Sequence, residues 1–435
     1  MFLKIAPNIM TQSLWRDEAF SVILSGLPFS QLLEVTINDF NPPLYYVVLS
    51  GWINLFGSGE IGVRSLSTLF LVLTGIGVFL VTSRLYSKRI SGFAAILALC
   101  NPFLFYYAFE ARMYTLLAFL VCLSFYFLIS NSWVLFSLVT VLGLYTHNFM
   151  VVALISELFA FLILCKNAKE HVKPLLLSLF AIFVGYIPWL VAVVGQVGNI
   201  YSNFWIESPS WKHVFTFFGE ILLDGAVTSF NSRFAIGLIF YLAVLVVFYR
   251  FFILKIEEAR VSVAIVLFIV APVFLTLLVS WVAVPLFVLR YLIFVVVPIS
   301  IFMAVLIGKM VPARLSLLFF ACTLSSFLYL NAQIFKNPHK LDIRNHIERI
   351  AAVSSGEPLV CGTILDFYQV KYYANRIFDS VPSIYVLSSG VVTYAGEALL
   401  ESKEVLDNLP QGEYFYIERE NVFVCTADVC KDLQL

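Results

Sequence analysis

The chain has 435 residues, of which 61% are hydrophobic and only 12% are charged. Soluble domains carry about 25% charged residues, so this composition excludes a single soluble globule, a disordered chain and a disulfide-rich secreted module. The 27 basic and 27 acidic residues cancel, and the net charge therefore gives no indication of nucleic-acid binding. A membrane protein with several spans remains, and its 43 Phe and 21 Tyr suit contact with lipid tails and headgroups.

The first 60 residues contain apolar patches that are broken by proline and glycine and separated by acidic residues. None of these patches is a clear span, since crossing a bilayer takes about 20 mostly apolar residues. We therefore expect residues 1–60 to form an external first loop whose helices lie at the membrane interface.

Ten longer apolar runs follow, between residues 61 and 335. A lipid-exposed backbone must be helical or part of a closed barrel. These runs lack the alternation of a barrel strand, so we predict a bundle of about ten transmembrane helices. The predicted spans are residues 61–84, 90–108, 113–130, 132–146, 149–165, 174–194, 234–252, 261–284, 289–307 and 315–333.

Basic residues lie in alternate connections between these spans, and such connections face the cytoplasm. They are Arg84, Lys88, Arg89, Lys166, Lys169, Lys173, Arg250, Lys255, Arg260, Lys309 and Arg314. The other side holds mainly acidic residues, namely Asp17, Glu18, Asp39, Glu60, Glu110, Glu207, Glu220 and Asp224. The pattern predicts a multi-pass protein of the inner (cytoplasmic) membrane, with the first loop and the C-terminal tail both outside the cytoplasm.

The tail, residues 336–435, is more polar than the rest of the chain. Residues 343–353 have helical periodicity, residues 358–364 resemble a buried strand, and residues 414–425 resemble one or two strands of a hairpin. The predicted fold is therefore an α-helical polytopic membrane protein with a small extracytoplasmic α/β domain.

Cys425 and Cys430 lie close together in this tail. An external domain is in an oxidising compartment, and a turn over this spacing is compatible with a disulfide. Cys361 is the competing partner. The cysteines and histidines show no zinc-type spacing, so we expect no structural metal.

Asp17 and Glu18 form a carboxylate pair in the first loop. Partial burial raises the pKa of a carboxylate toward the working pH, which suits a general base. The alternative interpretation is a solvated start of a helix.

From the predicted topology we expect further charged residues near the same membrane surface, where charges often mark functional sites. They are Arg64, Glu110, Arg112, His147 and Arg290. For the arginines the alternative is contact with lipid headgroups, and for His147 a structural role. Tyr114 also fits an interfacial aromatic belt. Glu157 falls in mid-span, where we expect a protonated or hydrogen-bonded group facing the bundle interior; the alternative is a proton relay.

Six short motifs follow one another along the chain: Trp15-Arg16-Asp17-Glu18-Ala19-Phe20, Asn41-Pro42-Pro43-Leu44-Tyr45-Tyr46, Gly62-Val63-Arg64-Ser65-Leu66-Ser67, Glu110-Ala111-Arg112-Met113-Tyr114, Tyr145-Thr146-His147 and Arg290-Tyr291. Their order resembles that of bacterial membrane glycosyltransferases of the dolichyl-phosphate-mannose protein mannosyltransferase class, within the GT-C superfamily. This group includes the lipid A aminoarabinose transferase. The resemblance covers nearly the whole chain.

The resemblance implies inverting transfer of one sugar from a polyprenyl-phosphate donor to an acceptor on the outer side of the membrane, the acceptor being a lipid, a glycan or a protein. It assigns Asp17 as catalytic base, with Glu18 beside it. Departing phosphate needs cations, for which Arg is well suited; Arg290 is the first candidate, with Arg64 and Arg112 next. Substrate-positioning candidates are Glu110, Tyr114, His147, Asn41 and Tyr45.

The sequence departs from this family in two places. Only Met1–Ser13 precede the first loop, whereas relatives usually have a spanning helix there, and we expect either a truncated start or a member that works without that helix. Asn41 stands where relatives often have His, which weakens the case for a metal at that point. No nucleotide-binding glycine loop is present in the sequence, and no cofactor is expected.

Two other functions remain open at this stage. A transporter or flippase for a lipid-linked sugar would also use rim arginines, but it would place its key charges near the bilayer midplane rather than on an external loop. An inactive, truncated paralogue would act as a binding subunit.

Overall fold

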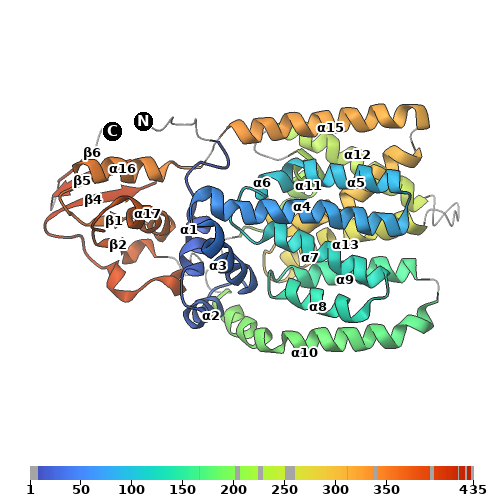
Figure 1. The fold of residues 1–435 in the computed structure, drawn as a ribbon, viewed down its shortest axis with the longest axis horizontal. Helices are drawn as coiled ribbons and strands as arrows, with labels where there is room; N and C mark the ends of the chain where they lie inside the picture. Colours follow the sequence, from blue (N-terminus) through green and yellow to red (C-terminus); the bar gives the residue numbers. More distant parts are fainter. Residues whose placement is uncertain are drawn as a thin grey trace. The chain divides into compact units, whose positions relative to one another are not determined.

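The computed structural model describes residues 8–165, 167–200, 206–223, 229–249, 260–310, 312–337, 340–391, 396–419, 421–426 and 429–432. The chain divides into two compact units. The first, here the mixed unit, combines Met1–Val63, Ala192–Phe204 and Asn337–Leu435; the second, the helical unit, comprises Arg64–Val191 and Trp205–Lys336 (Figure 1). Lys166, Asp224, Arg250 and Lys255, used above for orientation, lie outside the described residues.

The N-terminal part of the mixed unit contains three short helices, α1 (Arg16–Ser25), α2 (Phe29–Asn38) and α3 (Leu44–Phe56). Prolines precede two of them: Pro28 stands before α2 and Pro43 before α3, positions where a fixed φ and a missing N–H cost little. Gly57, at φ +81°, ends α3 in a conformation that favours glycine.

The C-terminal part of the mixed unit is an α/β domain, as predicted. Its helices are α16 (Ile343–Val353) and α17 (Ile364–Ile377), and its six-stranded sheet has the order β3-β2-β1-β4-β5-β6. The strands are β1 (Leu359–Cys361), β2 (Ile384–Leu387), β3 (Val405–Leu406), β4 (Glu413–Glu418), β5 (Asn421–Thr426) and β6 (Val429–Asp432). Strands β3, β2, β1 and β4 are parallel, and β4, β5 and β6 are antiparallel.

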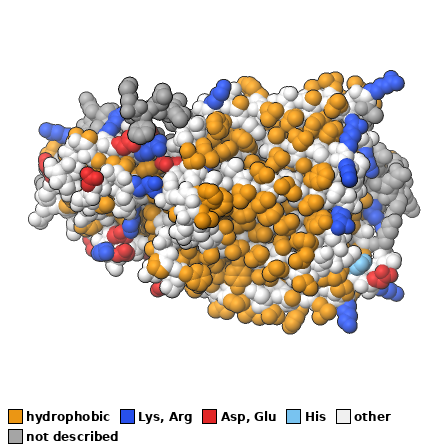
Figure 2. Space-filling model, in the orientation of Figure 1, with side chains coloured by type: hydrophobic (Ala, Val, Ile, Leu, Met, Phe, Trp, Pro, Cys, Tyr) orange, Lys and Arg blue, Asp and Glu red, His pale blue; other side chains and the backbone are white. Residues whose placement is uncertain are grey.

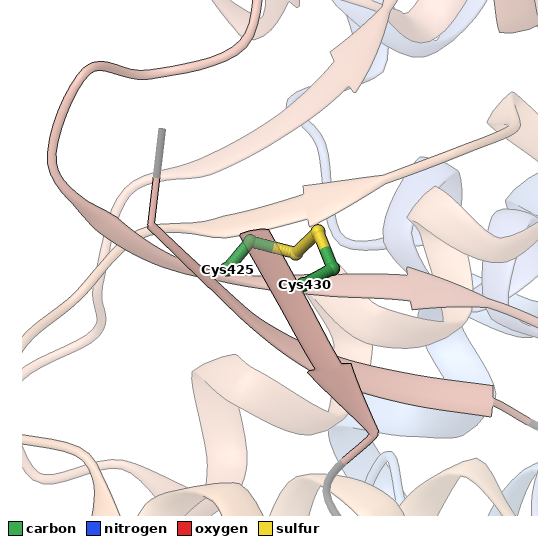
Figure 3. Close-up of a disulfide and its surroundings, with 2 residues drawn as sticks. All are labelled: Cys425 and Cys430. Carbon is green, nitrogen blue, oxygen red and sulfur yellow. A yellow bond between two sulfur atoms is a disulfide. The ribbon is translucent and has the colours of Figure 1, made fainter. Parts of the chain in front are cut away.

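A disulfide joins Cys425 of β5 to Cys430 of β6 (Figure 3). The two residues face each other across the antiparallel pair, with Cα atoms 4.1 Å apart. Cys361, the competing partner, is a free thiol buried in β1. The Cys425–Cys430 pairing is therefore confirmed.

Aromatic rings pack α1 against the rest of the mixed unit. The ring of Phe20 in α1 lies 5.4 Å from that of Tyr368 in α17 and 6.3 Å from that of Tyr46 in α3. Tyr368 donates a hydrogen bond to the carbonyl of Gly396. The α/β domain and the first loop thus share one core.

The helical unit is an all-α bundle. Six helices of the described chain are long and apolar enough to cross a membrane, and they occupy Glu60–Leu85, Lys169–Gln196, Phe230–Phe248, Arg260–Val282, Leu289–Lys309 and Arg314–Lys336. They correspond to α4 (Glu60–Leu85), α10 (Ala168–Ile200), α12 (Phe230–Phe248), α13 (Arg260–Val282), η3–α14–η4 (Leu289–Val295, Val296–Val305, Leu306–Met310) and α15 (Ala313–Lys336).

The other predicted spans form shorter helices: α5 (Lys88–Cys100), α6 (Pro102–Tyr107), α7 (Tyr114–Ile129), α8 (Trp133–Leu144) and α9 (Met150–Leu164), with α11 (Trp211–Leu223) added between spans. The continuous span expected at 90–108 is wrong. Pro102 cannot continue a helix, and Asn101 stabilises the break because its side-chain oxygen accepts from the N–H of Leu104 and its amide donates to the carbonyl of Ile221.

Exposed apolar side chains cover the helical unit, as its composition requires. Figure 2 shows hydrophobic side chains over much of the visible face of the helical unit, with Lys and Arg along the right-hand edge of that unit. On α10 alone, Phe180 and Val191 are 65% and 72% exposed. Such a surface suits contact with lipid.

Labelling from outside the cell tests the predicted orientation. Single cysteines introduced at Ser208 and Ser389, both exposed, should react with a membrane-impermeant maleimide in a chain whose free thiols have been replaced, and one at Asn167, also exposed, should not. The expectation follows from the positive-inside rule. Reaction at Asn167 in intact cells would overturn the arrangement.

Candidate functional site

The carboxylate pair lies at the start of α1 in the mixed unit, and its two members have different surroundings. The Asp17 side chain is 22% exposed, with one oxygen 3.2 Å from Nε of Arg16. Glu18 is fully buried; its Oε2 lies 3.1 Å from Nζ of Lys340 and accepts from the backbone N–H of Trp15 at 3.2 Å. Asp17 is thus the member able to meet a substrate, and Glu18 is held within the protein.

The segment leading into α1 is held by the α/β domain. The backbone N–H of Leu14 donates to Tyr373 at 2.7 Å, and the Leu14 carbonyl accepts from the amide of Gln369 at 2.9 Å, both on α17. Ser13 donates to Asp342, the N-cap residue of α16. The position of Asp17 therefore depends on residues more than 300 positions later in the chain.

Arg344 and Glu60 extend this network. The guanidinium of Arg344 lies 3.1 Å from Oε1 of Glu60 and also donates to the carbonyl of Thr11. Tyr373 donates to the same Glu60 oxygen at 2.9 Å. Burial first, and then the negative charge of Glu60, raise the pKa of Tyr373 well above its usual range. Tyr373 therefore remains a neutral donor.

The cationic candidates lie in the helical unit. Glu110 and Arg112 are buried in the short connection between α6 and α7, and Arg64 is fully buried near the start of α4. Ser67, one helical turn after Arg64, donates to the carbonyls of Glu110 and Arg112. These bonds satisfy backbone oxygens in a non-helical segment and fix it against α4.

His147 lies in the connection between α8 and α9, among aromatic rings. Its ring is 5.1 Å from that of Tyr291 and 6.2 Å from that of Tyr114. Burial first, then the positive charges of Arg112 and Arg290, lower the pKa of His147 to about 3. Its Nδ1 accepts from the backbone N–H of Phe149 at 3.1 Å, so the neutral ring carries its proton on Nε2.

The structure thus brings together Tyr114, His147, Arg112 and Arg290, with Tyr291, in the helical unit; we call these residues the cationic cluster. Two guanidinium groups and a neutral N–H donor suit an anion such as phosphate.

Asn41 and Tyr45 lie in the mixed unit, at the start of α3. Asn41 donates to Asp39 at 3.4 Å, and the ring of the buried Tyr45 is 6.0 Å from that of Tyr46. The roles of these two residues stay predictions, as do those of the other site residues. Within the described residues, no group of three or more His, Cys, Asp or Glu side chains is arranged to hold a metal.

Sequence reasoning missed Lys340, Gln369 and Tyr373, which hold the Asp17 segment. No local signal identifies them, because each acts across more than 300 residues of sequence. They lie in a tail that composition marked only as a polar domain.

Titration of His147 gives a test of the cationic cluster. The pKa of His147 is lower in the folded chain than its unfolded value of about 6.5, so below pH 6.5 protons bind the unfolded chain preferentially. The free energy of unfolding therefore decreases, by about 2 kcal/mol at pH 5. His147→Asn keeps an acceptor for the N–H of Phe149 but cannot titrate. Its thermal midpoint in detergent should therefore fall less between pH 7 and pH 5 than that of the wild type; an equal fall would contradict the assignment.

The comparisons with known proteins agree with this architecture. Residues 41–191 match the family model described as dolichyl-phosphate-mannose-protein mannosyltransferase. No curated protein matches the sequence significantly.

Solved structures show a similar fold. ArnT from Cupriavidus metallidurans in the apo state has 13% sequence identity and a TM-score of 0.63, covering 94% of this chain and 89% of that chain. The same protein bound to undecaprenyl phosphate has 13% identity and a TM-score of 0.59, covering 94% and 90%.

The Archaeoglobus fulgidus oligosaccharyltransferase in complex with Zn and sulfate has 12% identity and a TM-score of 0.52. That match covers 84% of this chain and 58% of the archaeal one. The family model covers less than half of the chain, and these solved structures show that its fold is similar to theirs.

Proposed function

We propose that the chain transfers a sugar from a polyprenyl-phosphate donor to an acceptor on the outer side of the cytoplasmic membrane. The observation that carries the proposal is the buried Arg112 and the partly buried Arg290 beside a neutral His147. The fold of the chain also resembles that of ArnT bound to undecaprenyl phosphate. A phosphate-linked donor is an anion that two guanidinium groups can bind.

The reaction is a single displacement at the anomeric carbon. Asp17 takes the proton of the acceptor hydroxyl as its oxygen bonds to that carbon, and the bond between the carbon and the phosphate oxygen breaks. The electron pair leaves with polyprenyl phosphate, and the configuration inverts. One positioned carboxylate is sufficient because the leaving group is already activated.

Arg112 and Arg290 stabilise the charge that grows on the departing phosphate, as preorganised cations do in a site that excludes water. The neutral His147 can donate from Nε2 without adding a third positive charge. The proposal requires no added cofactor or metal, so transfer should persist in EDTA.

Replacement of Asp17 tests the base. Asp17→Asn keeps the shape but removes the basicity, so turnover should fall by about 10²- to 10⁴-fold with the fold intact. The measurement is release of polyprenyl phosphate from lipid-linked sugars extracted from native membranes. Asp379→Asn, an exposed acid of the same unit, is the control. Near-normal turnover of purified Asp17→Asn would reject the proposal.

Replacement of Arg290 tests phosphate binding. Arg290→Lys keeps the charge but loses the two-pronged geometry, so donor affinity should fall by about tenfold or more, and further in Arg290→Ala. The control is Arg84→Lys. Arg84 lies in the last turn of α4 and, like Arg290, lies against a tyrosine ring. Donor binding is followed with a fluorescent polyprenyl phosphate; unchanged affinity of Arg290→Ala would remove Arg290 from the site.

A further inference from the structure

Lys340 lies at the start of the C-terminal α/β domain and makes a buried ion pair with the first loop. Its Nζ is 3.1 Å from Oε2 of Glu18, and the two side chains are 5% and 0% exposed. The same ammonium lies 5.7 Å from the centre of the Trp15 ring, and the backbone N–H of Lys340 donates to Gln12. Lys340 therefore contacts the loop on both sides of Leu14.

The Glu18 carboxylate, which pairs with Lys340, also caps the first turn of α1. Oε2 of Glu18 accepts the N–H of Trp15, the N-cap residue, so a single oxygen joins the ammonium to the helix start. Asp17 is the second residue of the same helical turn. A change in the position of Glu18 must therefore move Asp17 or alter its direction.

The energetics of this pair are asymmetric. Removing one member of a buried ion pair leaves a charge without compensation, whereas removing both is often tolerated. Glu18 at 0% exposure has no access to solvent that could replace Lys340. Loss of Lys340 alone should therefore disturb the first turn of α1 more than loss of both charges.

We infer that Lys340 is a positioning residue for the transfer reaction: through Glu18 it fixes the first turn of α1 and so holds the Asp17 carboxylate in place. This role rests on the proposed function of Asp17. It also gives the α/β domain a part in catalysis, since Tyr373 and Gln369 hold Leu14 on the other side of the same turn.

The test compares Lys340→Met, Lys340→Arg and the double variant Lys340→Met/Glu18→Gln. Lys340→Met should lower kcat by on the order of 10²-fold, as a misplacement of about 1 Å does, with the donor KM unchanged. Lys340→Arg should restore most of the activity, because it keeps the charge. The kcat of the double variant should be higher than that of Lys340→Met, because Gln at position 18 still accepts the N–H of Trp15 and no buried charge remains.

Hydrogen exchange of the full-length protein in detergent supplies a readout that does not depend on catalysis. The amides of residues 14–20 should exchange faster in Lys340→Met than in the wild type, and return toward wild-type rates in the double variant. Lys403→Met, which breaks an exposed pair with Glu401 in the same domain, is the matched control and should change neither kcat nor exchange.

The outcomes separate this inference from the proposed function. If Asp17→Asn retains turnover, the proposed function fails, while exchange still reports whether Lys340 holds the turn. If kcat of Lys340→Met equals that of the wild type, if exchange at residues 14–20 is unchanged, or if the double variant is no better than Lys340→Met, the positioning role is wrong.

Discussion

Buried polar groups must find partners inside the protein, and this constraint governs where the bundle can break its helices. In a membrane no water replaces a lost hydrogen bond. The break after α5 persists because Asn101 serves both the N–H of Leu104 and the carbonyl of Ile221. The segment after α6 persists because Ser67 and Thr68 donate to the carbonyls of Ala108, Glu110 and Arg112. Arg112 of the cationic cluster lies on the second of these non-helical segments.

The same constraint explains Glu157, which lies in α9 with no exposed surface. Ser124 of α7 donates to its Oε2 at 2.7 Å and lies 3.0 Å from the hydroxyl of Thr140 in α8. Three helices are thus joined by one chain of polar groups. The expectation of a hydrogen-bonded group facing the bundle interior is confirmed.

The fold could largely be predicted from the sequence because apolar runs and their polar ends report helices directly. Helix Ile343–Val353 was expected with the observed bounds, and the hairpin of β4 and β5 was expected within residues 414–425. The roles of the site residues stay predictions. Arg112, His147 and Arg290 lie near the ends of predicted spans, so the predicted topology alone leads us to expect them on one surface. The contacts of Lys340 and Tyr373 with the first loop could not be predicted, because they depend on how two distant segments fold together.

The grouping of the first loop with the tail also has a consequence for synthesis of the chain. Glu18 and Lys340 are 322 residues apart, and at about 5–20 residues per second the ribosome needs roughly 20 to 60 s to make the second after the first. During that time the predicted spans between them must enter the membrane. Lys340, which pairs with Glu18, and Tyr373 and Gln369, which hold Leu14, have not yet been synthesised. The start of α1 therefore reaches its final packing only at the end of biogenesis, so a nascent chain that stalls before the tail carries Asp17 without a fixed position.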